Sequence, residues 1–143
     1  MTDPLKKSEI FWIKAPRLLA IIVFSVGFIG KVLHPDIFLS FVYTTNLPIY
    51  FPEIIFSLFL SGEFVLTFML ILHPKNGSLF SALFLFVITV FVYWLYMNGF
   101  DDPCGFFGGL ASDTIGPAKI FQNSGLSLML LSSWFIEKRR SVS

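Results

Sequence analysis

Four long apolar segments, separated by short polar or proline-containing stretches, dominate the pattern of hydrophobic and polar positions along the chain. They cover about residues 15–33, 52–72, 78–97 and 117–136. Each is close to the ~20 residues that a helix needs to cross the hydrocarbon core of a bilayer. The pattern therefore predicts an all-α integral membrane bundle of four transmembrane helices, with residues 1–143 forming a single domain.

Prolines mark the expected ends of these helices. Pro16 suits the first turn of a helix, where its missing N–H costs no hydrogen bond, so we expect it to open the first helix. His34-Pro35 and His73-Pro74 are expected to end the first and second helices. Residues 34–51 and 98–116 then form the connections on one side of the membrane.

The basic residues are distributed unevenly between the two ends of the predicted bundle. Eight of the ten lysines and arginines precede the first helix, join the second to the third, or follow the fourth. Only Lys31 and Lys119 lie toward the opposite side. Because short loops rich in Lys and Arg stay in the cytoplasm, we expect both termini to be cytoplasmic.

Composition agrees with a membrane protein and argues against other classes. Hydrophobic residues make up 55% of the chain and charged residues 13%. The net charge of +1, without a basic cluster on an exposed face, argues against a nucleic-acid partner. A single cysteine, Cys104, excludes an internal disulfide and a multi-cysteine metal site. His34 and His73 are expected at opposite membrane faces, so they cannot share a metal ion.

Glu63 is the most informative residue, because it lies within the apolar run of the second predicted helix. Counted from Pro52 at ~1.5 Å per residue, it lies roughly 16 Å into the helix, near the midplane of a hydrocarbon core ~30 Å thick. A carboxylate there is costly unless it is protonated or paired, so it is a candidate functional residue. Two interpretations follow: a proton-handling or ligand-binding carboxyl group, or a neutral or paired residue that only fixes helix packing.

Four further residues are candidates to act with Glu63. Thr67 follows it by one helical turn on the same face. The first and second helices are antiparallel neighbours, which sets Gly27 close to Glu63 and leaves room for the carboxyl group. Lys31 is a candidate partner if its side chain bends inward, with snorkelling to water as the alternative. Arg17 would reach the site from the cytoplasmic end.

Two helical faces carry small residues. On the first helix this face consists of Ala20, Gly27, Gly30 and Lys31. On the fourth helix it consists of Ala118, Gln122, Gly125 and Ser132. Because small residues let helix backbones approach closely in membranes, we expect both faces to pack against neighbouring helices.

The connection before the fourth helix carries a glycine- and proline-rich run around Cys104. This composition predicts a tight, irregular turn. On the outer side the thiol would face an oxidising compartment, where a lone cysteine can form a mixed disulfide with a partner. The neighbouring Asp101 and Asp102 would reduce its reactivity. The alternative is that Cys104 is simply a small buried residue in a turn.

Several of these residues occur together in a known order and spacing: Arg17, Gly27, Gly30, Lys31, Pro48, Glu63 and the run Cys104-Gly105-Phe106-Phe107-Gly108. With this set the chain resembles the MauE family, the methylamine-utilisation membrane proteins of the DoxX-like superfamily, over about residues 16–135. The resemblance implies a four-helix bacterial inner-membrane protein associated with periplasmic thiol redox or with quinone-linked oxidoreductases. MauE itself is implicated in the maturation of methylamine dehydrogenase, whose small subunit carries many disulfides.

One position departs from the family's pattern. The MauE motif has Cys-Gly-Cys-Phe-Gly, and Phe106 stands at its second cysteine, so the loop cannot run a dithiol cycle alone. We therefore expect a redox-associated accessory protein, not a complete enzyme. It would assist a periplasmic oxidoreductase or its maturation, with Cys104 as the thiol and a protein partner in the membrane or periplasm. The alternatives are a structural or assembly subunit, or a binder of a small lipophilic molecule such as quinone beside Glu63. The sequence assigns no cofactor.

Overall fold

Helices make up most of the chain in the computed structural model, which describes residues 4–45, 52–100 and 114–142. These ranges contain five helices: α1 (Pro4–Leu33), α2 (Pro35–Thr44), α3 (Pro52–Leu72), α4 (Pro74–Met97) and α5 (Pro117–Val142). The expected all-α class is therefore confirmed. The helix boundaries differ from the expectation at several places, each with a local physical cause.

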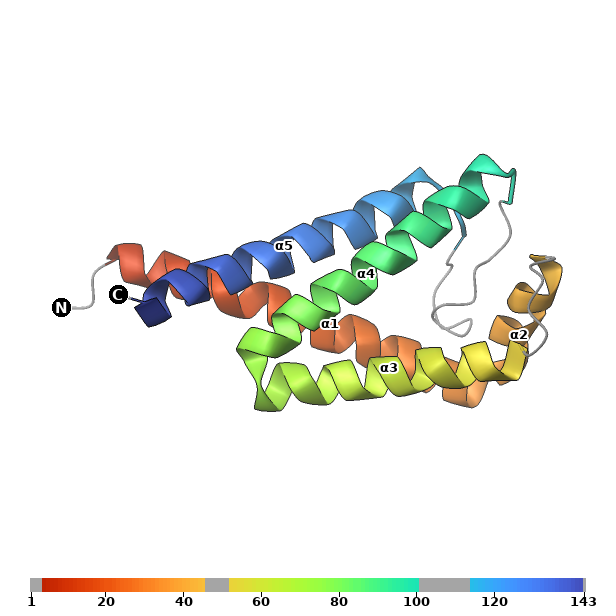
Figure 1. The fold of residues 1–143 in the computed structure, drawn as a ribbon, viewed down its shortest axis with the longest axis horizontal. Helices are drawn as coiled ribbons and strands as arrows, with labels where there is room; N and C mark the ends of the chain where they lie inside the picture. The colour runs from red at the N-terminus through yellow and green to blue at the C-terminus, as the bar shows by residue number, and fades with distance from the viewer. Residues whose placement is uncertain (1–3, 46–51, 101–113, 143) are drawn as a thin grey trace.

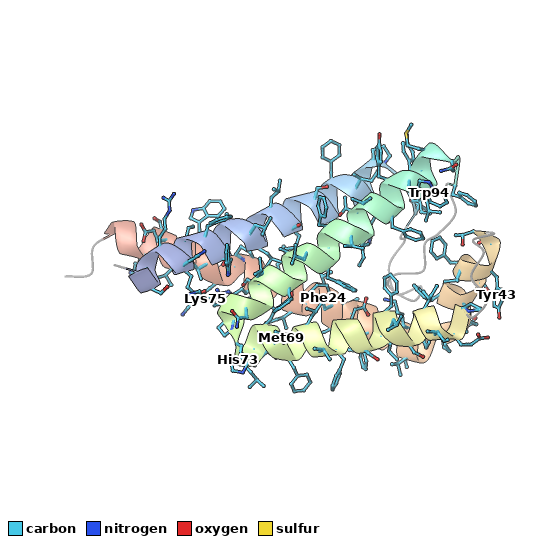
Figure 2. All side chains as sticks on the ribbon, in the orientation of Figure 1. Phe24, Tyr43, Met69, His73, Lys75 and Trp94 are labelled. Carbon is cyan, nitrogen blue, oxygen red and sulfur yellow. The ribbon has the colours of Figure 1, made fainter. Side chains whose placement is uncertain are left out.

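The long helices form a bundle that opens toward one end. α3 and α4 diverge from the tight turn at His73, α5 runs along α4, and α2 lies at the far end (Figure 1). α5 also packs on α1, and α3 packs on both α1 and α4. Lys75 lies near this turn and donates a hydrogen bond to Ser141 Oγ at 3.1 Å, whereas Tyr43 and Trp94 lie toward the other end (Figure 2). The α3–α4 turn and the C-terminal segment are thus joined.

Among the described residues, three helices are long and apolar enough to cross a membrane: Lys7–Leu33, Pro52–Leu72 and Pro74–Met97. The protein is therefore a multi-pass membrane protein whose apolar helices contact lipid. α5 has 26 residues but carries many polar side chains, and it does not meet the same criterion. The predicted fourth span stays a prediction.

The first helix begins earlier than expected. α1 starts at Pro4, so Pro16 lies inside the helix instead of opening it. An interior proline removes one backbone hydrogen bond. Neighbouring helices and small local adjustments accommodate that loss in membrane helices. Pro16 is buried in the bundle, which places it where such support is available.

The segment expected to be a plain connection after the first helix contains α2. Pro35 is its first residue, where a fixed φ favours a helical start, and Asp36 stands in the first turn near the positive end of the helix dipole. The expectation was wrong because Pro35 starts one helix as well as ending another. With 10 residues α2 is too short to span a bilayer. It buries Phe38, Phe41 and Val42 against side chains of α3 and α4.

The turn between α3 and α4 is tighter than expected, because α4 begins at Pro74 and includes Asn76 and Gly77. Gly77 is buried where the two helices meet. A Cβ atom at this position would lie 2.7 Å from Leu70 N and from the carbonyl atoms of Met69. Only a residue without a side chain allows this approach of two backbones.

Apolar side chains fill the bundle in two clusters. One lies toward α2 and contains Phe38, Phe41, Val42, Ile88, Val92, Leu95 and Ile115. The other joins α1, α3, α4 and α5 through Ala20, Phe24, Leu66, Leu70, Ala82, Leu85, Leu126 and Leu130. Along α3, Glu63 lies between Phe59, which packs on the first cluster, and Leu66 in the second.

The contact at Gly77 leads to a first prediction. We expect Gly77→Ala to lower the free energy of unfolding by about 1–3 kcal/mol, the usual cost of overpacking, because the opposing atoms are backbone. Denaturant unfolding of the purified protein in mild detergent measures this change. Gly125→Ala on α5 is the matched control, since a Cβ there meets nothing within 4 Å. That control should be neutral or stabilising, because alanine favours helix over glycine by about 1 kcal/mol. Equal unfolding midpoints for the two variants would contradict the prediction.

Candidate functional site

The central polar feature of the bundle is an ion pair between α1 and α3. Lys31 Nζ donates a hydrogen bond to Glu63 Oε1 at 2.7 Å. The two side chains are 0% and 7% exposed, so the pair is shielded from its surroundings by the rest of the bundle. Of the two alternatives for Lys31, the structure shows the side chain turned inward toward Glu63.

Several further interactions stabilise the inward position of the Lys31 side chain. Lys31 lies in the last turn of α1, where a positive charge interacts favourably with the helix dipole. Its ammonium group lies 3.5 Å from the carbonyl oxygen of Gly27, one turn earlier. It also lies 5.5 Å from the ring centroid of Phe38 on α2, within the range of a cation–π interaction. Lys31 thus connects α1, α2 and α3.

Two residues of α5 complete the polar centre. Lys119 and Asn123 are buried, and they line the same small cavity as Glu63. The positive charge of Lys119 acts favourably on the Glu63 carboxylate. The cavity has a volume of about 30 Å³, enough for about one water molecule. Glu63 Oε2 has no hydrogen-bond partner among the described residues. This carboxylate oxygen can therefore accept a hydrogen bond from a donor in the cavity.

Sequence reasoning did not assign Lys119 and Asn123 to the site. The available signal was their spacing of four residues just after Gly116-Pro117, which places two polar side chains on one helix face. Lys119 was instead grouped with the basic residues that distinguish the two membrane sides. Its burial shows that it belongs to the interior of the bundle.

The face of α5 that packs against the bundle is not the one expected from small residues. Ala118, Gln122 and Ser132 are exposed, so the expectation for this helix was wrong. α5 instead buries side chains that bond to neighbouring backbones. Ser127 Oγ donates to the Ala82 carbonyl oxygen at 2.9 Å, and Ser133 Oγ donates to the Ile13 carbonyl oxygen at 3.1 Å. The buried face of α5 thus combines these hydrogen-bonding serines with the core residues Leu126 and Leu130. On α1, by contrast, the expected small face is buried, namely Ala20, Gly27, Gly30 and Lys31.

The remaining candidate residues lie in other places. Arg17 does not reach Glu63, because its Nε donates to Ser78 Oγ at 2.8 Å and its guanidinium pairs with Glu137. Thr67 donates its hydroxyl hydrogen to the backbone carbonyl of Glu63 at 2.7 Å and not to the carboxylate. Cys104 lies outside the described residues, as do Pro48 and the glycine-rich run around the cysteine.

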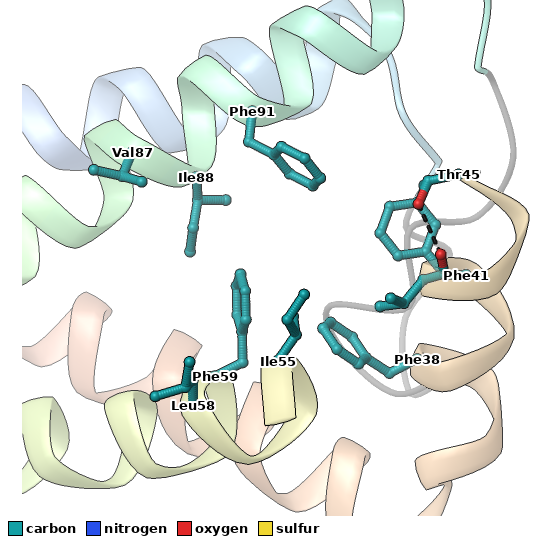
Figure 3. A pocket seen from close by; sticks show the side chains of 10 residues that line it. Phe38, Phe41, Thr45, Ile55, Leu58, Phe59, Val87, Ile88 and Phe91 are labelled. Carbon is teal, nitrogen blue, oxygen red and sulfur yellow. Dashed lines mark hydrogen bonds between the residues drawn. The ribbon is translucent and has the colours of Figure 1, made fainter. Parts of the chain in front are cut away.

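A larger, apolar cavity lies beside the ion pair. It has a volume of about 300 Å³ and is bounded by α2, α3 and α4 (Figure 3). Its lining is Phe38, Phe41, Val42, Thr45, Ile55, Leu58, Phe59, Val87, Ile88 and Phe91. Phe38 also contacts the Lys31 ammonium group, and Ile88 also lines the small cavity at Glu63. The polar centre and the apolar cavity are therefore neighbours with shared walls.

The fold and the site together define a multi-pass helical membrane protein with a buried ion pair between two of its spanning helices. Residues 8–136, most of the chain, match the family described as "Methylamine utilisation protein MauE". The chain therefore belongs to the MauE family. No curated protein and no solved structure matches it.

The ion pair leads to a second prediction. We expect Lys31→Met or Glu63→Leu alone to lower the free energy of unfolding by about 3–5 kcal/mol, because each leaves a buried charge without its partner. The double variant Lys31→Met/Glu63→Leu should recover much of this loss, since it leaves neither charge behind. Unfolding in detergent across this double-mutant cycle gives the coupling between the two residues. Losses that simply add in the double variant would show that the pair does not hold α1 and α3 together.

Proposed function

We propose that this protein is an accessory membrane protein of methylamine utilisation, which assists a periplasmic oxidoreductase or its maturation. The observation that carries the proposal is the family match over residues 8–136. The covered Lys31–Glu63 pair supports an accessory role, because it neutralises both charges within the bundle and holds two helices in register. Thiol chemistry would then depend on Cys104 and a partner protein.

The proposal includes four spanning helices with both termini in the cytoplasm of a bacterial inner membrane. The support for α5 as the fourth span is the division of its two faces. Its outward side chains include Phe121, Leu128 and Phe135, which are 78%, 66% and 55% exposed. Its polar side chains Lys119 and Asn123 are buried. Large apolar side chains stand on the outside, together with Gln122 and Ser132, whereas the two buried polar side chains avoid lipid, as a spanning helix requires.

A thiol test examines the accessory role. In a strain of the native host from which the gene for this protein has been deleted, we expect the wild-type gene to restore growth on methylamine and the activity of methylamine dehydrogenase. Cys104→Ser should fail to restore either, and should lose a mixed-disulfide band on non-reducing gels after thiols are blocked before lysis. Immunoblots must show equal protein levels. Full restoration by Cys104→Ser would instead support a structural or assembly subunit. Failure of the wild-type gene itself would overturn the link to methylamine.

A second candidate function is the binding of a small lipophilic molecule such as a quinone, and the apolar cavity favours it. The cavity at Glu63, of about 30 Å³, is too small for such a molecule. The binding site proposed here is therefore the neighbouring cavity of about 300 Å³. Pockets of this size with mostly apolar and aromatic lining are typical of small-molecule sites. Four phenylalanines line this one (Figure 3).

A pair of α4 variants tests this binding. Val87 and Val90 are both exposed residues of α4, at 65% and 51%, but of the two only Val87 lines the cavity. We expect Val87→Trp to weaken binding of decylubiquinone by about tenfold, equivalent to ~1.4 kcal/mol, because the indole ring occupies part of the cavity. Val90→Trp should leave the Kd unchanged. Native mass spectrometry in detergent measures the bound fraction. Equal affinities in all variants would exclude the cavity as the site.

A further inference from the structure

A third cavity lies between α1 and α5, close to the two chain termini. Its volume is about 290 Å³, and its lining is Ile10, Ile13, Lys14, Arg17, Glu137 and Arg140. We call it the basic cavity. Neither the ion pair at Glu63 nor the apolar cavity between α2, α3 and α4 shares a residue with it.

Positive charge predominates around the basic cavity. Lys14, Arg17 and Arg140 contribute three positive charges, against the carboxylates of Glu137 and of Glu9, which pairs with Arg140. These five residues carry a net charge of +1. Lys138 and Arg139 precede Arg140 in the chain but do not line the cavity.

The guanidinium group of Arg17 is held in a fixed position at this cavity. Its Nε donates to Ser78 Oγ on α4 at 2.8 Å, and its NH2 group pairs with Glu137 on α5. The side chain is only 12% exposed, so it forms an ordered part of the wall. With Nε and NH2 engaged in this way, the remaining guanidinium nitrogen, NH1, is the one that a phosphate oxygen would use, and its direction is fixed.

The lining is apolar as well as charged. Ile10 and Ile13 contribute hydrocarbon surface beside the basic side chains. The neighbouring Trp12 is 54% exposed. On α5, Lys138 Nζ lies 4.9 Å from the ring centroid of Trp134. Tryptophans are enriched at the boundary between acyl chains and head groups, which suits exposed Trp12 and partly buried Trp134.

We propose that the basic cavity binds the phosphate of an anionic phospholipid. The phosphate lies against Lys14, Arg17 and Arg140, and the glycerol and first acyl carbons lie against Ile10 and Ile13. Basic pockets between membrane helices recognise anionic head groups in this way. A soluble phosphate compound would use the charges but not the apolar wall, so the mixed lining favours a lipid. The inference does not depend on the proposed redox role.

Lipid competition in detergent tests the proposal. Native mass spectrometry of the intact protein should show that phosphatidylglycerol is retained about tenfold more than phosphatidylcholine. Lys14→Gln and Arg140→Gln should each reduce this preference severalfold. Arg139→Gln is the matched control, because it removes the same charge from a neighbouring residue that does not line the cavity. It should leave the preference unchanged.

Three results would overturn the proposal. The absence of a preference for phosphatidylglycerol would exclude an anionic lipid site. An equal effect of Arg139→Gln and Arg140→Gln would show a diffuse charge effect in place of a defined cavity. Displacement of the lipid by millimolar glycerol 3-phosphate would show that the charges alone are recognised and that the apolar wall adds nothing. Circular dichroism of each variant confirms that the helices are intact.

Discussion

The structure depends on one constraint: a charge inside an apolar bundle must have a partner. Lys31 and Glu63 meet this constraint for each other across α1 and α3, at 2.7 Å and almost completely covered. Separating the helices, or sliding one along the other, would leave two charges in a medium that solvates them poorly. The pair therefore fixes the relative height of α1 and α3, which apolar contacts alone specify much less sharply.

The other helix contacts follow from the same environment. Lipid is as apolar as the helix surfaces, so burial of apolar groups gives little preference for one helix partner over another. Close backbone contact and hydrogen bonds provide that preference. Gly77 allows α4 to cross α3 tightly, and Ser127 and Ser133 bond α5 to carbonyl groups of α4 and α1. Each long helix is thus held by at least one polar or close contact.

Sequence reasoning was most successful where one strong physical rule acts alone. The length and apolarity of the second segment predicted the bounds of α3, and the cost of a buried carboxylate directed attention to Glu63. For Lys31 the sequence left pairing and snorkelling open, and the structure shows the pairing. Sequence reasoning failed where two rules compete. Pro35 can end one helix and start the next, and only tertiary packing reveals α2. On α5 the expected small residues and the residues that bond to neighbouring backbones occupy different faces, and the face with Ser127 and Ser133 is the buried one.

The short helix α2 connects the polar centre to the apolar cavity. Phe38 of α2 contacts the ammonium group of Lys31 and at the same time lines that cavity. A displacement of α2 would remove this ring from Lys31 and uncover part of the ion pair, which is unfavourable. A molecule that fills the cavity without moving α2 keeps the ring in place. Whether the Lys31–Glu63 pair stays covered therefore depends on the position of α2 and of this one aromatic side chain.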